Sequence, residues 1–255
     1  MLALLSPAKK QVFDKNKKNT ISSEIMFRQE AGELVSLLKR LSSDELGKLM
    51  SISPTLADLN KKRYENFDPN FSNSAITTPA VLAFQGDAYQ SLQALDFTHE
   101  DMKFCQHNLA IISGLYGLLK PYDLIQPYRL EMKTTLGNSK GNNLYDFWGN
   151  KVAERVLMAL QQHKSKVVIN LASDEYAKVL RHKQNIFPII TVDFKENKNN
   201  ELKTIGIHAK KARGAMARFI IKNKIEDPSG ILEFNTNGYV FNNDLSTAEK
   251  LVFIR

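Results

Sequence analysis

The sequence predicts a mixed α/β fold, a single domain with a central mixed sheet flanked by helices. Short, continuous apolar runs recur along the chain, and most of them end in small or turn-forming residues. Segments whose apolar residues have helical spacing lie between some of these runs. A strand followed by a helix, repeated along the chain, is the pattern of sheets covered by helices.

The expected strands are apolar runs of four to six residues, which suit buried strands. They cover residues 2–5, 80–84, 109–112 and 167–172. The small residues that follow them include Ser6, Gly86, Ser113, Gly114 and Ser173. Ligands of α/β sheets bind beyond the carboxyl ends of the strands, where small residues let them approach the backbone. The same residue types also suit ordinary turns, so both interpretations stay open.

Two segments have the spacing of amphipathic helices. Residues 26–41 are apolar at positions 27, 31, 34, 35, 38 and 41. Residues 146–163 repeat the pattern with Trp148, Val152, Val156, Leu157 and Leu160. Residues 187–209 are typical of a two-stranded hairpin around a polar loop.

We expect one domain over residues 1–255. The polar loops at 15–24, 137–143 and 195–201 are too short to act as domain linkers. A chain of 255 residues can bury a sizeable core without disulfides or metals. Its hydrophobic fraction of 43% and charged fraction of 24% are ordinary for a globular protein.

Composition also predicts the compartment. No run approaches the roughly 18 apolar residues that a membrane span requires. The first ten residues make a poor signal peptide, because their apolar stretch is short and the charge follows it. The single cysteine, Cys105, excludes an internal disulfide framework. We therefore expect a cytoplasmic protein without membrane contact; the oligomeric state is not predicted.

The formal net charge is +8 and the isoelectric point is about 9.4. Such an excess of basic residues favours polyanionic partners, either nucleic acid or phosphorylated small molecules.

The most basic segment is HAKKARGAMARFIIKNK, residues 208–224, with six Lys or Arg and no acid. On a helix over 209–223 the apolar residues share one side and the cations flank the other. Lys210 and Arg213 lie on one flank of that surface, and Lys211, Arg218 and Lys222 lie on the other. Three of them crowd the first turn, which already carries partial positive charge, and a bound phosphate would relieve this conflict. A solvated face, or ion pairs with acids elsewhere in the fold, are the alternatives.

A second segment, residues 112–132, contains Gly114 and Gly117 between apolar stretches, with Lys120 close behind. A glycine hairpin of this form can offer its amides to a phosphate, as in helix-hairpin-helix motifs. A strand that ends in a tight turn is the alternative. The neighbouring Tyr128 and Arg129 have the chemistry to stack on and clamp a nucleotide, although Pro-Tyr pairs also pin loops against a core.

Most familiar catalytic and metal-binding patterns are absent from the sequence. There is no Walker A motif, no GxGxxG and no GxSxG, and the five histidines are scattered. We therefore expect no metal site and no cofactor. Ser6 and Lys9 invite a nucleophile pair that nothing completes. The acids near strand ends and turns are candidate general bases that no spacing marks: Asp87, Asp123, Glu131, Asp174 and Glu175.

Seven segments together resemble the YaaA family of peroxide-stress resistance proteins. They are LLSPAK (4–9), SPTLADLNKKR (53–63), PAVLAFQGDAY (79–89), SGLYGLLKPYDLIQPYRLEM (113–132), LYDFWG (144–149), NLASDEY (170–176) and AKKARGAMARF (209–219). The resemblance runs almost from end to end. This chain differs from the family pattern at Lys120, where members usually carry Arg, and at Lys133, where they usually carry Gly.

The resemblance implies a cytosolic protein that protects cells against hydrogen peroxide and helps to keep intracellular iron low. It also implies one mixed α/β domain with a positively charged cleft and a helix-hairpin-helix element. Family members are described as binding duplex and branched DNA.

Two functions remain open from the sequence. The first is DNA binding of weak sequence specificity through phosphate contacts. Its candidate ligands are Lys9, Gly114, Gly117, Lys120, Tyr128, Arg129 and the five helix cations. The second is an enzyme that acts on a nucleotide or another phosphorylated small molecule at the strand ends. Basic residues in an open stripe would favour the first, and convergence on one pocket would favour the second. A protein that binds iron directly is disfavoured by the sparse ligand set.

Overall fold

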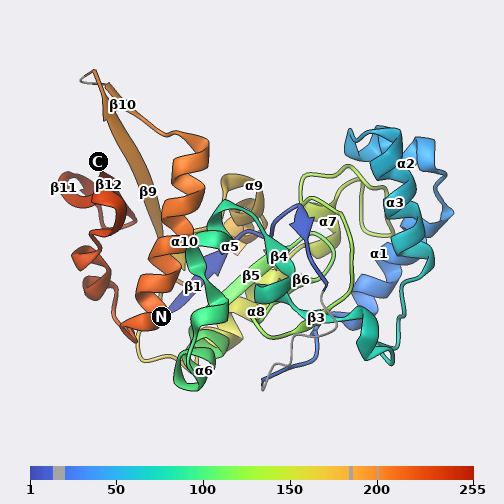
Figure 1. Ribbon diagram of the computed structural model, residues 1–255, viewed down its shortest axis with the longest axis horizontal. Coiled ribbons are helices and arrows are strands. Elements are labelled where there is room, and N and C mark those ends of the chain that lie inside the picture. The colour runs from blue at the N-terminus through green and yellow to red at the C-terminus, as the bar shows by residue number, and fades with distance from the viewer. Residues whose placement is uncertain (14–20, 184–185, 200) are drawn as a thin grey trace.

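A mixed sheet forms the centre of the protein. The computed structural model describes residues 1–13, 21–183, 186–199 and 201–255. Its eight-stranded sheet has the order β11-β12-β9-β8-β1-β5-β6, with β10 paired to β9 (Figure 1). The strands are β1 (Leu2–Leu5), β5 (Leu109–Ser113), β6 (Gly117–Leu119), β8 (Val168–Asn170), β9 (Ile189–Lys198), β10 (Glu201–Lys203), β11 (Val240–Thr247) and β12 (Lys250–Ile254). Strands β5, β1, β8, β9 and β12 are parallel, and β6, β10 and β11 are antiparallel to their partners. The predicted mixed α/β fold is confirmed.

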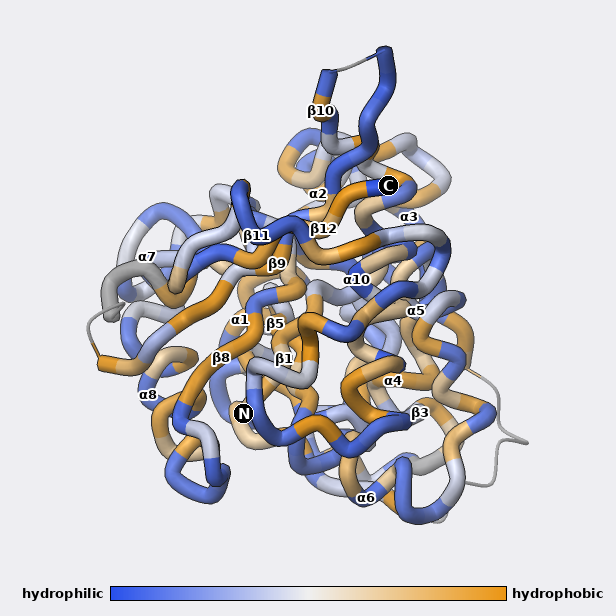
Figure 2. The backbone as a smooth tube through the Cα atoms, turned by 90° about the vertical axis from the view of Figure 1, so that its left-hand side faces the viewer, coloured by the Kyte–Doolittle hydropathy of each residue, from blue (hydrophilic) through white to orange (hydrophobic). Residues whose placement is uncertain are grey.

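The buried strands are those that the apolar runs predicted at 2–5, 109–112 and 167–172. Strand β1 lies between β5 and β8, with Leu4 opposite both Ala110 and Asn170. Every residue of β1 is buried. Figure 2 shows hydrophobic residues along β8, in contrast to the hydrophilic tip of the β9–β10 hairpin.

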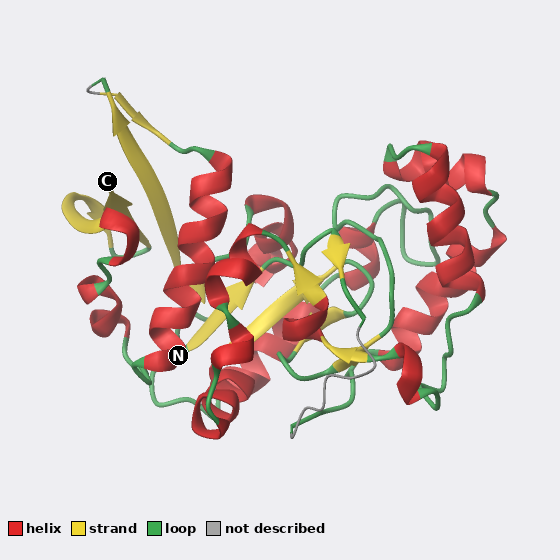
Figure 3. Ribbon diagram, viewed as in Figure 1, coloured by secondary structure: helices red, strands yellow, loops and turns green. Residues whose placement is uncertain are grey.

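Most of the helices lie beside the sheet, and three of them form a separate group beyond its β6 end (Figure 1). They are α1 (Arg28–Arg40), α2 (Ser43–Met50), α3 (Pro54–Glu65), α4 (Ala80–Ala83), α5 (Asp87–Leu92), α6 (His99–Asn108), α7 (Leu144–Trp148), α8 (Lys151–Leu160), α9 (Asp174–Ala177) and α10 (Gly206–Lys222). Helices α1, α2 and α3 gather at the right of Figure 3, whereas α10 and α5 lie together near β1. None of the helices in the described residues has the length and apolar character of a membrane span.

Short elements complete the chain. Strand β2 (Lys10–Gln11) pairs with β4 (Phe84–Gln85), and β3 (Thr78–Pro79) pairs with β7 (Leu124–Ile125). Short 3-10 helices are found at Ser74–Ile76, Ala94–Asp96, Lys178–Lys183, Pro228–Glu233 and Thr236–Gly238.

The two predicted helices are present, and one of them is broken. Helix α1 buries Ala31, Leu34, Val35 and Leu38, the residues that its spacing selected. The segment 146–163 forms two helices, α7 and α8. Gly149 separates them with a φ of 47°, a value outside the helical range that glycine adopts at little cost.

Two strand predictions need correction. Residues 80–84 were expected as a strand, but Ala80–Ala83 forms helix α4 and only Phe84–Gln85 is extended. A run that is apolar throughout has no period, so a buried helix turn and a buried strand look alike in sequence. The hairpin expected over 187–209 is present as β9 and β10, but helix α10 already begins at Gly206.

The helix-hairpin-helix expected around Gly114 and Gly117 is a β-hairpin, because β5 and β6 flank the turn. Both glycines are buried and serve packing. A Cβ on Gly114 would lie 2.3 Å from the Leu130 carbonyl oxygen, and one on Gly117 would lie 2.7 Å from the Trp148 ring. The Tyr116 N–H in the turn donates to Ser113 Oγ, so this amide already has an acceptor.

Candidate functional site

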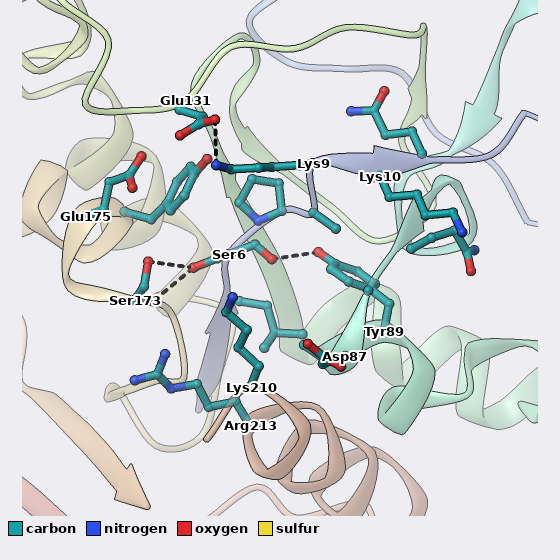
Figure 4. Close-up of a pocket in the computed structure, with 18 of the residues that line it drawn as sticks. Ser6, Lys9, Lys10, Asp87, Tyr89, Glu131, Ser173, Glu175, Lys210 and Arg213 are labelled. Carbon is teal, nitrogen blue, oxygen red and sulfur yellow. Dashed lines mark hydrogen bonds and ion pairs between the residues drawn. The ribbon is translucent and has the colours of Figure 1, made fainter. Parts of the chain in front are cut away.

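A cavity of about 530 Å³ opens beyond the carboxyl ends of β1 and β8 (Figure 4). We call it the central cavity. Five segments form its walls: residues 5–11, which run from the end of β1 through β2; residues 85–89, which include the start of α5; residues 128–133; residues 171–176, which run from the end of β8 into α9; and helix α10. The polar and aromatic side chains that line it include Ser6, Lys9, Lys10, Asp87, Tyr89, Tyr128, Arg129, Glu131, Lys133, Ser173, Glu175, Tyr176, Lys210 and Arg213. Its position is the one where ligands of α/β sheets usually bind.

Two serines that follow neighbouring parallel strands meet in the middle of the cavity. The Ser6 hydroxyl donates to Ser173 Oγ at 3.3 Å, and the Ser173 N–H donates to Ser6 Oγ at 2.9 Å. The Tyr89 hydroxyl donates to the Ser6 carbonyl oxygen at 2.9 Å, which ties α5 to the end of β1. We call Ser6 and Ser173 the serine pair.

Glu131 neutralises two of the predicted phosphate ligands. Its Oε1 lies 2.9 Å from Lys9 Nζ and 3.1 Å from Arg129 Nη2. The side chains of Glu131 and Arg129 are only 14% and 16% exposed, so water screens this pair weakly. Lys9 and Arg129 therefore belong to the central cavity, but each already has an anionic partner.

Lys210 and Arg213 bring positive charge without such a partner. They are three residues apart on α10 and therefore lie on one flank of the helix. Neither has an ion-pair partner among the described residues, and Arg213 Nε is buried without a hydrogen-bond acceptor. Burial lowers the pKa of the Arg213 guanidinium, while Asp193 and Asp174 raise it from beyond ion-pair distance. We call Lys210 and Arg213 the cation pair.

The other three helix cations lie elsewhere. Lys211 borders a separate cavity of about 230 Å³ beside His208 and Arg255. Arg218 donates to the carbonyl oxygens of Leu92 and Gln93 at 3.2 and 3.1 Å and lies 3.7 Å from Asp96. Lys222 lies 2.6 Å from Asp101. Arg218 and Lys222 thus have partners within the protein, which is the alternative that the sequence left open.

The remaining residues predicted to bind phosphate either lie away from the central cavity or make contacts that hold the fold together. Gly114 and Gly117 are buried in the β5–β6 turn. Lys120 borders a cavity of about 110 Å³ at the other end of the sheet, where β1 and β5 begin. Tyr128 reaches the central cavity, but it is 2% exposed and its hydroxyl is 2.7 Å from Ser113 Oγ. Tyr128 therefore anchors its loop against the core.

Three tyrosines form an uncharged, aromatic part of the cavity wall. Burial raises the pKa of Tyr89, Tyr128 and Tyr176 far above the usual value of a phenol. Their hydroxyls therefore stay protonated at physiological pH and act as hydrogen-bond donors or acceptors, not as anions.

Sequence reasoning did not select Lys10, Tyr89 or Tyr176 as site residues. Tyr89 and Tyr176 lie within PAVLAFQGDAY and NLASDEY, and Lys10 directly follows LLSPAK. These segments carry the family resemblance. A prediction that every polar or aromatic residue within them lines the site would have included Tyr89 and Tyr176 but not Lys10.

The described residues contain no group of three or more His, Cys, Asp or Glu side chains arranged to hold a metal ion. The side chains of the central cavity supply ammonium, guanidinium, hydroxyl and carboxylate groups. Such a set can bind an anion and can donate or accept protons.

Comparison with known proteins identifies the family. A sequence model described as peroxide stress protein YaaA matches residues 1–245. The UPF0246 protein lpl1317 of Legionella pneumophila (strain Lens) is 45% identical over 255 residues, covering 100% of this chain and 99% of that protein. A UPF0246 protein of Crocosphaera subtropica is 43% identical with 100% of both chains covered, and Bpet1601 of Bordetella petrii is 43% identical over 100% and 99%. The chain therefore belongs to the YaaA (UPF0246) family of peroxide stress proteins.

Proposed function

We propose that this peroxide stress protein acts by binding a phosphate-bearing ligand in the central cavity. The observation that carries the proposal is the cation pair. A half-buried guanidinium whose Nε has no acceptor is costly to leave without a carboxylate partner, because desolvated charge needs compensation. The exposed ammonium of Lys210 adds a second positive charge one helical turn away. An anion bound between Lys210 and Arg213 would supply it.

Phosphate suits this place better than a carboxylate does. Arginine binds two phosphate oxygens through its planar fork, and lysine adds a point charge. The serine pair offers hydroxyl groups for a third oxygen. These donors come from three different elements, so a tetrahedral anion is a better match than a planar one.

DNA is the first candidate ligand. Lys10, Lys133 and Lys210 are exposed at the cavity, where they can meet further phosphates of one strand. Binding would have weak sequence specificity, because phosphates carry no sequence information. Association with DNA in the cytoplasm would allow the protein to limit peroxide damage there. Any lowering of intracellular iron would then be an indirect effect.

A nucleotide or another phosphorylated small molecule is the second candidate. The supporting observation is that the cation pair, Lys10 and Lys133 border one compact cavity, whose 530 Å³ lies within the usual range for small-molecule sites. Asp87 and Glu175 in the wall would be the candidate general bases for an enzymatic reaction.

The experiment is a binding titration of the full chain with duplex DNA, branched DNA, single-stranded DNA, a mononucleotide and inorganic pyrophosphate. Each titration is run at about 50 and 200 mM salt, because phosphate contacts release counterions and weaken steeply with salt. Tight, strongly salt-dependent binding of DNA supports the first candidate, and tighter binding of the mononucleotide supports the second. If none of the phosphate compounds binds at low salt, the proposal is wrong.

A further inference from the structure

Charged side chains without an ion-pair partner among the described residues lie at both ends of the central cavity. Figure 4 shows Lys210 and Arg213 on one side of the serine pair, and Glu131 and Glu175 on the other. A ligand that reaches both ends can combine an anionic group at the cation pair with hydrogen-bond donors at a carboxylate.

The carboxylates of Glu131 and Glu175 are not equivalent. Glu131 is neutralised by Lys9 and Arg129. Glu175 has no cationic partner within ion-pair distance among the described residues. Its Oε1 accepts only the backbone N–H of Lys133, at 3.3 Å. Since Glu175 lines the cavity and has no ion-pair partner, it is the carboxylate at this end that a ligand can reach.

The segment that carries Glu175 is held in place. The Tyr145 hydroxyl donates to the Glu175 carbonyl oxygen at 2.8 Å. Tyr176, the next residue, is buried at 9% exposure. A carboxylate on a fixed backbone can select between ligands by the pattern of their donors.

We propose that the central cavity binds one guanine nucleotide unit, with its phosphate at Lys210 and Arg213 and the N1–H and N2 amino group of its base at Glu175. This inference rests on the proposed function, because it requires phosphate at the cation pair. Guanine presents two adjacent N–H donors, which match the two oxygens of a carboxylate. Adenine and cytosine present one amino group beside a ring nitrogen that accepts, and this acceptor would face the carboxylate unfavourably. The largely buried Tyr89 and Tyr176 also line the cavity.

The guanine unit has two sources with the same chemistry. One is a free mononucleotide. The other is an unpaired guanine of a DNA strand, turned out of the base stack into the cavity, which costs least where the base is already unpaired. Both present a phosphate on one side and the same donor edge on the other.

The first test compares GMP, IMP and AMP by calorimetric titration of the full chain. IMP lacks only the N2 amino group, so it isolates one of the two proposed hydrogen bonds. We expect GMP to bind about tenfold tighter than IMP and tighter still than AMP, since a lost hydrogen bond to a charged group costs about 1.5 kcal/mol or more. Glu175→Gln should remove most of this preference while AMP still binds. Glu154→Gln, on the exposed face of α8, is the matched control and should keep the preference.

The second test addresses the source. Single-stranded oligothymidylate with one central dG is compared with the same strand carrying dA, and with a hairpin in which the dG is paired. A preference for unpaired dG that Glu175→Gln abolishes identifies the strand as a source; a preference among mononucleotides alone identifies the free nucleotide.

The outcomes separate this inference from the proposed function. If GMP, IMP and AMP bind equally, the strands show no preference for dG, and Glu175→Gln changes neither, the guanine assignment is overturned while phosphate binding stands. If no nucleotide or strand binds at all, both proposals fail. Thermal unfolding of each variant shows that a lost preference is not a lost fold.

Discussion

Gly214 of α10 lies directly against the backbone of Ala88 in α5. A Cβ on Gly214 would stand 1.8 Å from the Ala88 carbonyl oxygen, a distance that no real structure tolerates. The close approach fixes α10 beside the start of α5. It thereby sets the cation pair, on the neighbouring residues of α10, against the same cavity as the serine pair.

Substitution of Gly214 should therefore destabilise the fold although it lies in a helix. Glycine to alanine inside a helix normally stabilises by up to about 1 kcal/mol. In Gly214→Ala the clash with backbone should outweigh this gain, with a net loss of about 1–3 kcal/mol in urea unfolding. Gly32→Ala, in α1 where nothing lies within 4 Å of the added Cβ, is the control and should be neutral or stabilising. Equal gains in both variants would contradict the packing role.

The pH dependence of the free energy of unfolding below about pH 4 should depend on Asp101. Burial pushes the pKa of this carboxyl upward, but hydrogen bonds from Lys222, Lys224 and Thr98 outweigh it and hold the pKa well below its usual value. A depressed folded pKa stabilises above the unfolded value of about 3.9, and the gain is lost as pH falls below it.

The measurement is unfolding free energy between pH 7 and pH 2 for the natural chain and Asp101→Asn. The variant should lose about 3 kcal/mol at pH 7, because it leaves Lys222 and Lys224 without their anion. Its stability should also fall less steeply below pH 4. An unchanged acid slope would show that Asp101 does not control it.

Asp123 should produce the opposite slope. It is 2% exposed, and desolvation raises its pKa to about 6, even though it accepts hydrogen bonds from Ser23 and the Lys120 N–H. The folded protein therefore holds this proton more tightly than the unfolded chain, so stability should decrease as pH rises from about 4 to about 6. A shift of this size corresponds to roughly 2–3 kcal/mol. Asp123→Asn should remove the decrease; a variant that retains it would refute the assignment.

Cys105 should take no direct part in peroxide chemistry. The thiol is fully buried, and burial raises its pKa above the usual value, so the reactive thiolate is scarce. After exposure of the folded chain to hydrogen peroxide, a thiol titration in denaturant should still find one free thiol per chain. Peroxide added after unfolding should consume it. Peroxide protection in cells should survive Cys105→Ala, and its loss in a variant that remains folded would contradict this view.

The central strands of the sheet could be predicted because each of them is recognisable from its own residues. LALL, LAII and VVINLA are continuous apolar runs, and each forms a buried strand. The run at 80–84 misled because it is equally apolar and has no period to distinguish helix from strand. Gly149 ended a helix that the apolar spacing alone would have continued.

The site was only partly predictable, because charge pairing depends on contacts that are distant in sequence. Lys222 forms an ion pair with Asp101, which is 121 residues away in the sequence, and no residue near Lys222 indicates this partner. Helical spacing places Lys210 and Lys211 on different flanks of α10, but it does not show that only the flank of Lys210 borders the central cavity. Gly114 and Gly117 resembled a phosphate-binding hairpin because sequence does not reveal the Leu130 backbone and the Trp148 ring that require glycine there.

This difference between two adjacent lysines offers the most direct test of the central claim. Lys210→Met and Lys211→Met remove the same charge from the same helix. Their affinities for duplex DNA and for inorganic pyrophosphate are measured across a salt series. We expect Lys210→Met to weaken binding about tenfold and to reduce the DNA salt slope by about 1, with Lys211→Met close to the natural chain. Equal effects of the two variants, or no effect of Lys210→Met, would contradict a phosphate site at the central cavity.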